Sequence, residues 1–140
     1  MSSDLGAGVR RAVDADVDAV LDLWRVAAEG ASATDDRDGV MRLLAHDPAA
    51  LLVAERDGVI VGTVIAAWDG WRAHCYRLAV LPGHRRSGVA RALLETAEER
   101  FAAVGARRLD ALVVDGNERA EQVWSAAGFR LQTGMRRWVK

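Results

Sequence analysis

Three arginines surround a glycine in the middle of the sequence, directly after a short apolar run. They are Arg85, Arg86 and Arg91. The apolar run, residues 78–81, ends at Pro82, because proline cannot donate a hydrogen bond to a sheet ladder. An amphipathic helix is predicted to begin at Gly88, and the first N–H groups of a helix have no partner within it. These N–H groups, the positive end of the helix dipole and the arginines together predict a phosphate site.

Two common nucleotide-binding patterns do not match this segment. The third glycine of a dinucleotide fingerprint would fall on Leu93, and no Gly-Lys-Ser or Gly-Lys-Thr triplet is present for a triphosphate loop. A nucleotide-binding domain that uses the same helix terminus stays open as an alternative, with ATP or NAD as its ligand.

The order of residues here resembles a known motif. Leu-Ala-Val-Leu-Pro precedes Arg85-x-x-Gly88-x-Ala90, which is similar to the pyrophosphate-binding motif of the GNAT superfamily of N-acetyltransferases. A second segment resembles the Asn, Ala, Tyr, Gly-Phe pattern of the same family. It reads Asn117-x-x-Ala120-x-x-x-Trp124-x-x-x-Gly128-Phe129. The resemblance covers nearly the whole chain and implies an α/β (α+β) fold in one domain, residues 1–140, with a mixed, mostly antiparallel sheet flanked by helices.

By this resemblance the acetyl donor is acetyl-CoA. In the family two neighbouring strands splay apart at their ends, and the pantetheine arm bonds the backbone of the first strand as an added strand would. The amides from Arg86 to Arg91 match those that hold the pyrophosphate. The full set of expected acetyl-CoA contacts is Leu78, Ala79, Val80, Arg85, Arg86, Ser87, Gly88, Val89, Ala90, Arg91 and Asn117.

The resemblance implies direct attack of a neutral amine on the thioester in a ternary complex, without a covalent enzyme intermediate. The backbone N–H of Val80 is the expected donor to the developing oxyanion. A general base helps, directly or through water, because amines are mostly protonated at pH 7. The family often has a glutamate at the position of His74, so this histidine is the first candidate for the general base. The alternative is that His74 is a half-exposed hairpin residue with no catalytic role. Four carboxylates compete with it by charge only: Glu29, Asp35, Asp36 and Asp69.

Trp124 departs from the family pattern. A tyrosine usually stands there and protonates the leaving thiolate, whereas an indole N–H donates a hydrogen bond but does not give up its proton. A thiolate leaves readily by itself, so we expect Trp124 either to pack in the core or to line the thioester pocket. Tyr76 is a weaker substitute for the acid. These departures leave a non-catalytic acyl-CoA-binding module as the alternative function.

Periodicity predicts the elements that carry these residues. Strands are expected at residues 9–13, 51–56, 59–68, 71–81, 109–114 and 129–139. A first helix with apolar residues Val17, Val20, Leu21 and Trp24 is expected to stop near Gly30. After a loop at 31–39, helices are expected around residues 40–44, at 88–105 and at 118–127. Asp57-Gly58 and Asp69-Gly70 are strong signals for two-residue hairpins.

Composition limits the classes of partner. The single cysteine, Cys75, excludes an internal disulfide, is expected to be buried and inert, and favours a reducing cytoplasm. No metal site, nucleic-acid partner or membrane contact is expected, and the oligomeric state, monomer or homodimer, stays open. Residues 1–57 carry twelve acids and six bases, whereas residues 58–140 carry eight acids and thirteen bases. The acceptor is expected to be a small-molecule amine, a peptide N-terminus or a lysine.

Overall fold

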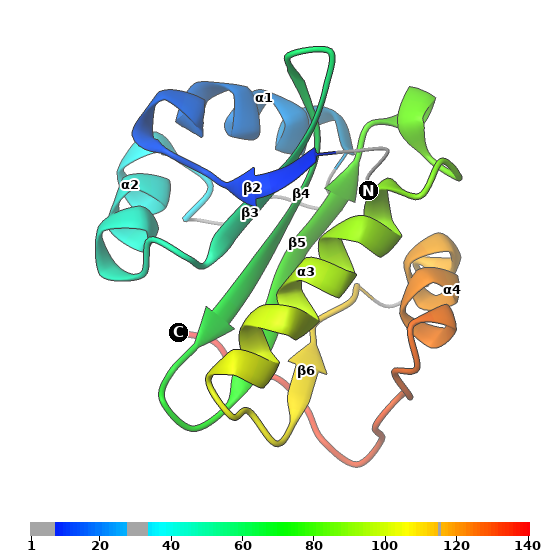
Figure 1. The fold of residues 1–140 in the computed structure, drawn as a ribbon. Coiled ribbons are helices and arrows are strands. Elements are labelled where there is room, and N and C mark those ends of the chain that lie inside the picture. The colour runs from blue at the N-terminus through cyan, green and yellow to red at the C-terminus, as the bar shows by residue number, and fades with distance from the viewer. Residues whose placement is uncertain (1–7, 28–33, 115) are drawn as a thin grey trace.

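A five-stranded sheet forms the centre of the molecule, in the order β2-β3-β4-β5-β6 (Figure 1). The computed structural model describes residues 8–27, 34–114 and 116–140. The strands are β2 (Gly8–Arg11), β3 (Leu51–Arg56), β4 (Val59–Trp68), β5 (Ala73–Val80) and β6 (Leu109–Ala111). β2 to β5 pair antiparallel, and β6 runs parallel to β5. The prediction of a mixed, mostly antiparallel sheet is confirmed.

Helices cover both faces of the sheet. They are α1 (Val17–Ala27), α2 (Arg37–His46), α3 (Val89–Ala103) and α4 (Glu118–Ala126), with two 3-10 turns, η1 (Asp14–Asp16) and η2 (Pro82–His84). α1 and α2 lie on one face and α3 crosses the other (Figure 1), and a separate hydrophobic cluster fills each side. The apolar residues predicted for α1 are buried in these clusters, and so is the apolar face of the amphipathic α3, which comprises Val89, Leu93, Leu94, Ala97 and Phe101. Among the described helices none is both long and apolar enough to cross a bilayer.

Two short connections join β3 to β4 and β4 to β5, and they place these strands side by side. Asp57 and Gly58 both have positive φ, 52° and 77°, as a type I′ hairpin requires. The second connection is longer than predicted, since β4 ends at Trp68 and β5 begins at Ala73. The carboxylate of Asp69 closes it by accepting the two N–H groups of residues 71 and 72, at 2.8 and 2.7 Å.

Two predictions at the C-terminal end are wrong. The strand expected at 109–114 stops at Ala111 and is half-buried, and no strand forms at 129–139. Leu131 and Trp138 are instead 89% and 92% exposed. The physical reason is that a strand needs a neighbour to satisfy its backbone, and β6 offers an edge of only three residues. The helix stop predicted at Gly30 lies outside the described residues.

Gly62 in β4 lets α3 pack directly on the sheet. A Cβ atom built at this position would lie 2.8 Å from Cγ1 of Val89 and 3.2 Å from the carbonyl oxygen of Ala79. Because Val89 is β-branched and fully packed, it has little freedom to move away. The side chain that opens α3 therefore rests on the one β4 residue that has no side chain.

We expect Gly62→Ala to lower the free energy of unfolding by about 1–3 kcal/mol, because it overpacks the contact between α3 and β4. Urea denaturation measures this difference. Gly8→Ala is the matched control, since a Cβ at that strand position meets nothing within 4 Å. Equal stability of the two variants would contradict the close approach.

Candidate active site

β6 covers only the first part of β5. The parallel pairing joins residues 73–75 to residues 109–111, and β6 then ends. Beyond Cys75 no strand in the described part of the chain pairs with this side of β5. Residues 76–80 therefore form an open edge, at the position where the sequence predicts the splayed strands.

Hydrogen bonds to β4 decide which backbone groups face the open edge. The N–H of Leu81 donates to the carbonyl of Val61 at 2.9 Å. Alternate residues of a strand direct their backbone groups to opposite sides, so Ala79 also turns toward β4. Leu78 and Val80 turn away from β4 and toward the open edge. Both amides are available to an extended ligand, and the predicted contacts with pantetheine at Leu78, Ala79 and Val80 stay predictions.

The chain runs from this edge into a loop of backbone N–H groups. After η2, Arg86 and Gly88 adopt positive φ of 61° and 87°, and α3 begins at Val89. The first bond of the helix is from the N–H of Ala92 to the carbonyl of Gly88, at 3.0 Å. The N–H groups of residues 86–91 thus precede the helix ladder, and no acid lies in the first turn of α3. This is the geometry that stabilises an anion at a helix N-terminus.

Two arginines hold this loop against the strands. The guanidinium of Arg56, at the end of β3, donates to the hydroxyl of Ser87 at 3.0 Å and to its carbonyl at 2.9 Å. The Ser87 hydroxyl donates in turn to the carbonyl of His84. Nε of Arg85 donates to the carbonyl of Val80 at 3.1 Å, at the end of the open edge. Arg56 was not predicted from the sequence, where its only signal is its place directly before the Asp57-Gly58 turn.

We expect Arg56→Gln to raise KM for acetyl-CoA about five- to tenfold, because two hydrogen bonds that order the loop are lost. The change in kcat should stay below about twofold, since Arg56 lies away from the thioester end of the open edge. Steady-state kinetics with varied acetyl-CoA measures both values. Arg42→Gln, on the exposed side of α2, is the control. An unchanged KM would mean that Arg56 does not order the loop.

His74 lies near the start of β5, between two carboxylates. Its Nε2 is 3.5 Å from Oδ2 of Asp69, and its Nδ1 is 3.7 Å from Oδ2 of Asp110. Hydrogen bonds from the amides of Arg72 and Trp71 lower the pKa of Asp69, which therefore stays ionised well into acid. An imidazolium formed at His74 would have a carboxylate within 4 Å of each ring nitrogen.

Distance limits how His74 could act. It lies six residues before Val80 in the same strand, which corresponds to about 20 Å at 3.3 Å per residue. The separation from Leu78 is four residues, or about 13 Å. A proton from an amine at either amide would therefore reach His74 through water and not by direct contact.

The rival carboxylates have structural partners. Asp35 forms an ion pair with Arg77 of β5, and both side chains are mostly buried. Asp36 is the N-cap of α2, where its carboxylate accepts the N–H of Gly39 at 2.7 Å. Asp69 closes the turn before β5. Glu29 lies outside the described residues. Of the three that the structure describes, Asp69 is the one whose carboxylate lies beside His74.

The residues of the second motif pack together behind α3. Trp124 is buried in the α3-side cluster and meets Phe129 edge to face, with ring centroids 4.9 Å apart. This burial agrees with the packing role of Trp124. Asn117 caps α4 by accepting the N–H of Ala120 at 3.1 Å. Its predicted contact with acetyl-CoA stays a prediction. Tyr76 is half-buried, and its ring centroid lies 6.2 Å from that of His74.

Cys75 is buried in the core, as predicted. Its side chain is 1% exposed, and burial raises the pKa of the thiol to about 12. It is therefore a protonated thiol at neutral pH and no nucleophile.

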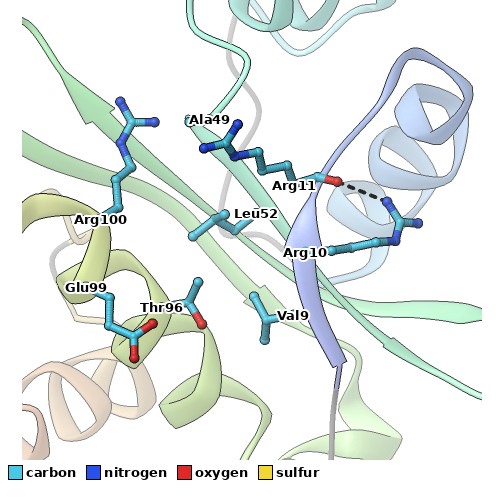
Figure 2. A pocket seen from close by; sticks show the side chains of 8 residues that line it. All are labelled: Val9, Arg10, Arg11, Ala49, Leu52, Thr96, Glu99 and Arg100. Carbon is cyan, nitrogen blue, oxygen red and sulfur yellow. Dashed lines mark hydrogen bonds between the residues drawn. The ribbon is translucent and has the colours of Figure 1, made fainter. Parts of the chain in front are cut away.

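A cavity of about 350 Å³ lies apart from the open edge, between β2 and α3 (Figure 2). Leu52 and Val9 form its floor, while Thr96, Glu99 and Arg100 of α3 stand at one side. It contains none of the predicted site residues. This hollow is therefore not the candidate active site, whose groove is the unpaired side of a strand.

Comparison with known proteins assigns the family. The model of the acetyltransferase (GNAT) family matches residues 17–129. An acetyltransferase of Pectobacterium atrosepticum is 36% identical over 103 residues, which cover 74% of this chain and 73% of the relative. The chain belongs to the GNAT acetyltransferase family.

Solved structures share the fold. An aminoglycoside antibiotic 6'-N-acetyltransferase from Acinetobacter haemolyticus matches with a TM-score of 0.78 at 21% identity, over 95% of this chain and 97% of its own. The diaminobutyrate acetyltransferase of Paenibacillus lautus, solved with L-2,4-diaminobutyric acid and coenzyme A, matches with a TM-score of 0.72 at 23% identity. That match covers 87% of this chain and 74% of the other. The resemblance to the GNAT fold is thereby confirmed.

Proposed function

We propose that the protein is an acetyl-CoA-dependent N-acetyltransferase that acts on a primary amine by direct attack in a ternary complex. One observation carries the proposal: the open edge of β5 leads without interruption into the loop of N–H groups before α3. An elongated donor with a reactive end and a pyrophosphate needs these two features in this order. The backbone groups fit such a donor, because Leu78 and Val80 turn to the edge and residues 86–91 precede the helix ladder.

Acetyl-CoA supplies the activated acetyl group as a thioester. The chain supplies orientation, since the amides of the loop bind the pyrophosphate and the open edge aligns the arm. The N–H of Val80, or of Leu78 two residues before it, donates to the carbonyl oxygen as negative charge grows there. Each is a fixed backbone dipole and needs little reorganisation.

His74 accepts the proton of the incoming amine through water. Asp69 and Asp110 flank the imidazole at 3.5 and 3.7 Å, so each ring nitrogen faces a carboxylate. The same carboxylates favour a cationic amine near this end of β5 over an anionic one. No side chain needs to protonate the leaving sulfur, because a thiolate is stable enough to leave alone. This explains how Trp124 is compatible with transfer.

Turnover with a panel of amines tests the proposal. The panel holds lysine, spermidine, tyramine, kanamycin and a short peptide with a free N-terminus, and the released thiol is measured. We expect thiol release that depends on one class of amine and yields the acetylated amine by mass. Binding of coenzyme A without turnover of any amine would favour the alternative, a non-catalytic acyl-CoA-binding module. Displacement of coenzyme A by ATP or NAD would favour a nucleotide-binding domain.

A further inference from the structure

Thr63 is the buried polar side chain of the described core. It is fully buried in β4, where its hydroxyl makes two hydrogen bonds. It accepts the indole N–H of Trp24 at 2.9 Å and donates to the carbonyl of Arg77 at 2.9 Å. A hydroxyl buried in this way is costly unless its bonds are made. The bond to Arg77 reaches the middle of β5, where the strand is irregular.

The irregularity is a β-bulge at Arg77. Thr63 pairs with Ala79, whereas two positions further along β4 Ile65 pairs with Tyr76, so β5 contains one extra residue. Arg77 has a φ of 52°, in the left-handed region that non-glycine residues rarely adopt. Thr63 thus donates a hydrogen bond to the carbonyl of Arg77, the bulge residue with positive φ.

The bulge decides which amides face the open edge. Without it, alternation would turn Arg77 and Ala79 to the edge and Leu78 to β4. With it, Leu78 and Val80 face the edge. Side chains follow the same change: Cys75, before the bulge, and Leu78 and Val80, after it, all pack on the α3 side. Bulges of this kind re-aim backbone groups next to functional sites.

The side chain of Arg77 is held on the same network. Its guanidinium lies over the ring of Trp24, 5.5 Å from the centroid, and pairs with Asp35 in the segment before α2. The side chains of the ion pair are 16% and 18% exposed. Trp24 therefore contacts both partners of this hydrogen bond: its N–H donates to Thr63, and its ring lies against the guanidinium of Arg77.

We propose that Thr63, oriented by Trp24, is a positioning residue that holds the bulge at Arg77 and thereby directs the amides of Leu78 and Val80 to the thioester. The inference rests on the proposed function for its catalytic consequence. It does not rest on that function for the geometry, because the bulge exists in the free protein. Thr63 acts through the backbone of β5 and touches no substrate.

Thr63→Val tests this, since valine has nearly the same shape and lacks the hydroxyl. Thr96→Val is the matched control: Thr96 on α3 also donates to a backbone carbonyl, that of Ala92 at 2.9 Å, away from the open edge. Thr63→Ser keeps the hydroxyl and should rescue. Trp24→Phe removes the N–H that orients Thr63, and provides a second variant if Thr63→Val does not fold.

The first readout is amide hydrogen exchange of the free protein by NMR. In the wild type we expect Ala79 to exchange at least about tenfold more slowly than Leu78 and Val80. Thr63→Val should remove this contrast, whereas Thr96→Val and Thr63→Ser should keep it. Retention of the contrast in Thr63→Val and in Trp24→Phe would overturn the proposal. This readout needs neither acetyl-CoA nor an amine.

The second readout is kinetic, with acetyl-CoA and the amine that the panel selects. We expect kcat of Thr63→Val to fall about tenfold to a hundredfold while KM for acetyl-CoA changes less than about threefold, because the phosphate loop is intact. A smaller folded fraction would also lower the apparent kcat at constant KM, so kcat is calculated per folded enzyme, whose concentration is measured by circular dichroism at the assay temperature. A parallel fall in Thr96→Val, or unchanged kcat in Thr63→Val, would contradict positioning. If the wild type acetylates no amine, the proposed function fails and hydrogen exchange alone decides the role of Thr63.

Discussion

Gly88→Glu should abolish the stabilisation of the protein by coenzyme A. Gly88 has a φ of 87° and lies at the N-cap of α3, among the N–H groups that precede the helix ladder. Glutamate there adds negative charge and bulk at the proposed pyrophosphate site, and it strains the backbone by about 1 kcal/mol. A Cβ at Gly88 meets nothing within 4 Å, so the variant is expected to fold. Thermal unfolding with and without coenzyme A measures the effect.

Gly105→Glu is the matched control for this experiment. Gly105 also has a positive φ, 77°, and also has open space around it, but it follows the C-terminal end of the same helix. The two variants therefore share the backbone strain and the added charge. We expect Gly105→Glu to retain the shift with coenzyme A. A wild-type shift in Gly88→Glu would place the phosphate elsewhere.

His74→Gln should lower kcat about a hundredfold, within the range that general-base catalysis contributes. Glutamine keeps a polar side chain between Asp69 and Asp110 but cannot take up a proton. KM for acetyl-CoA should stay the same, because His74 lies at the far end of β5 from the phosphate loop. The acid limb of the kcat profile against pH should disappear with the side chain.

His46→Gln, at the exposed end of α2, should leave kcat and its pH profile unchanged. An unaltered profile in His74→Gln would assign the proton to another group. Asp69 is then the next candidate, since it lies beside His74 and its pKa is lowered. With such a carboxylate as the base, kcat would stay unchanged to a more acidic pH than with a histidine.

Local chemistry was sufficient to predict the parts of the site that lie close together in sequence. The proline stop at Pro82, the glycine at Gly88 and the apolar spacing of α3 are properties of neighbouring residues, and the structure confirms each of them. The Asp57-Gly58 turn was predictable for the same reason, because two residues with positive φ define it. The cap of α4 by Asn117 likewise needs only a residue three positions away.

The features that escaped prediction depend on contacts between distant segments. Arg56 and Ser87 are separated by 31 residues, and Trp24 and Thr63 by 39. Neither pair has a signal in its own neighbourhood. The missing strand at 129–139 has the same cause, since its alternating residues are typical of a strand but the edge strand β6 has only three residues to pair with.

The sequence by itself therefore determined the phosphate loop, the helices and the Asp57-Gly58 hairpin, because short-range sterics and capping decide them. Tertiary structure alone decided the site that this loop serves. The bulge at Arg77 reverses the alternation of β5, and it is defined only by the pairing with β4, where Thr63 bonds the carbonyl of Arg77. Which amides face the open edge depends on that register, and register is a property of two strands and not of one.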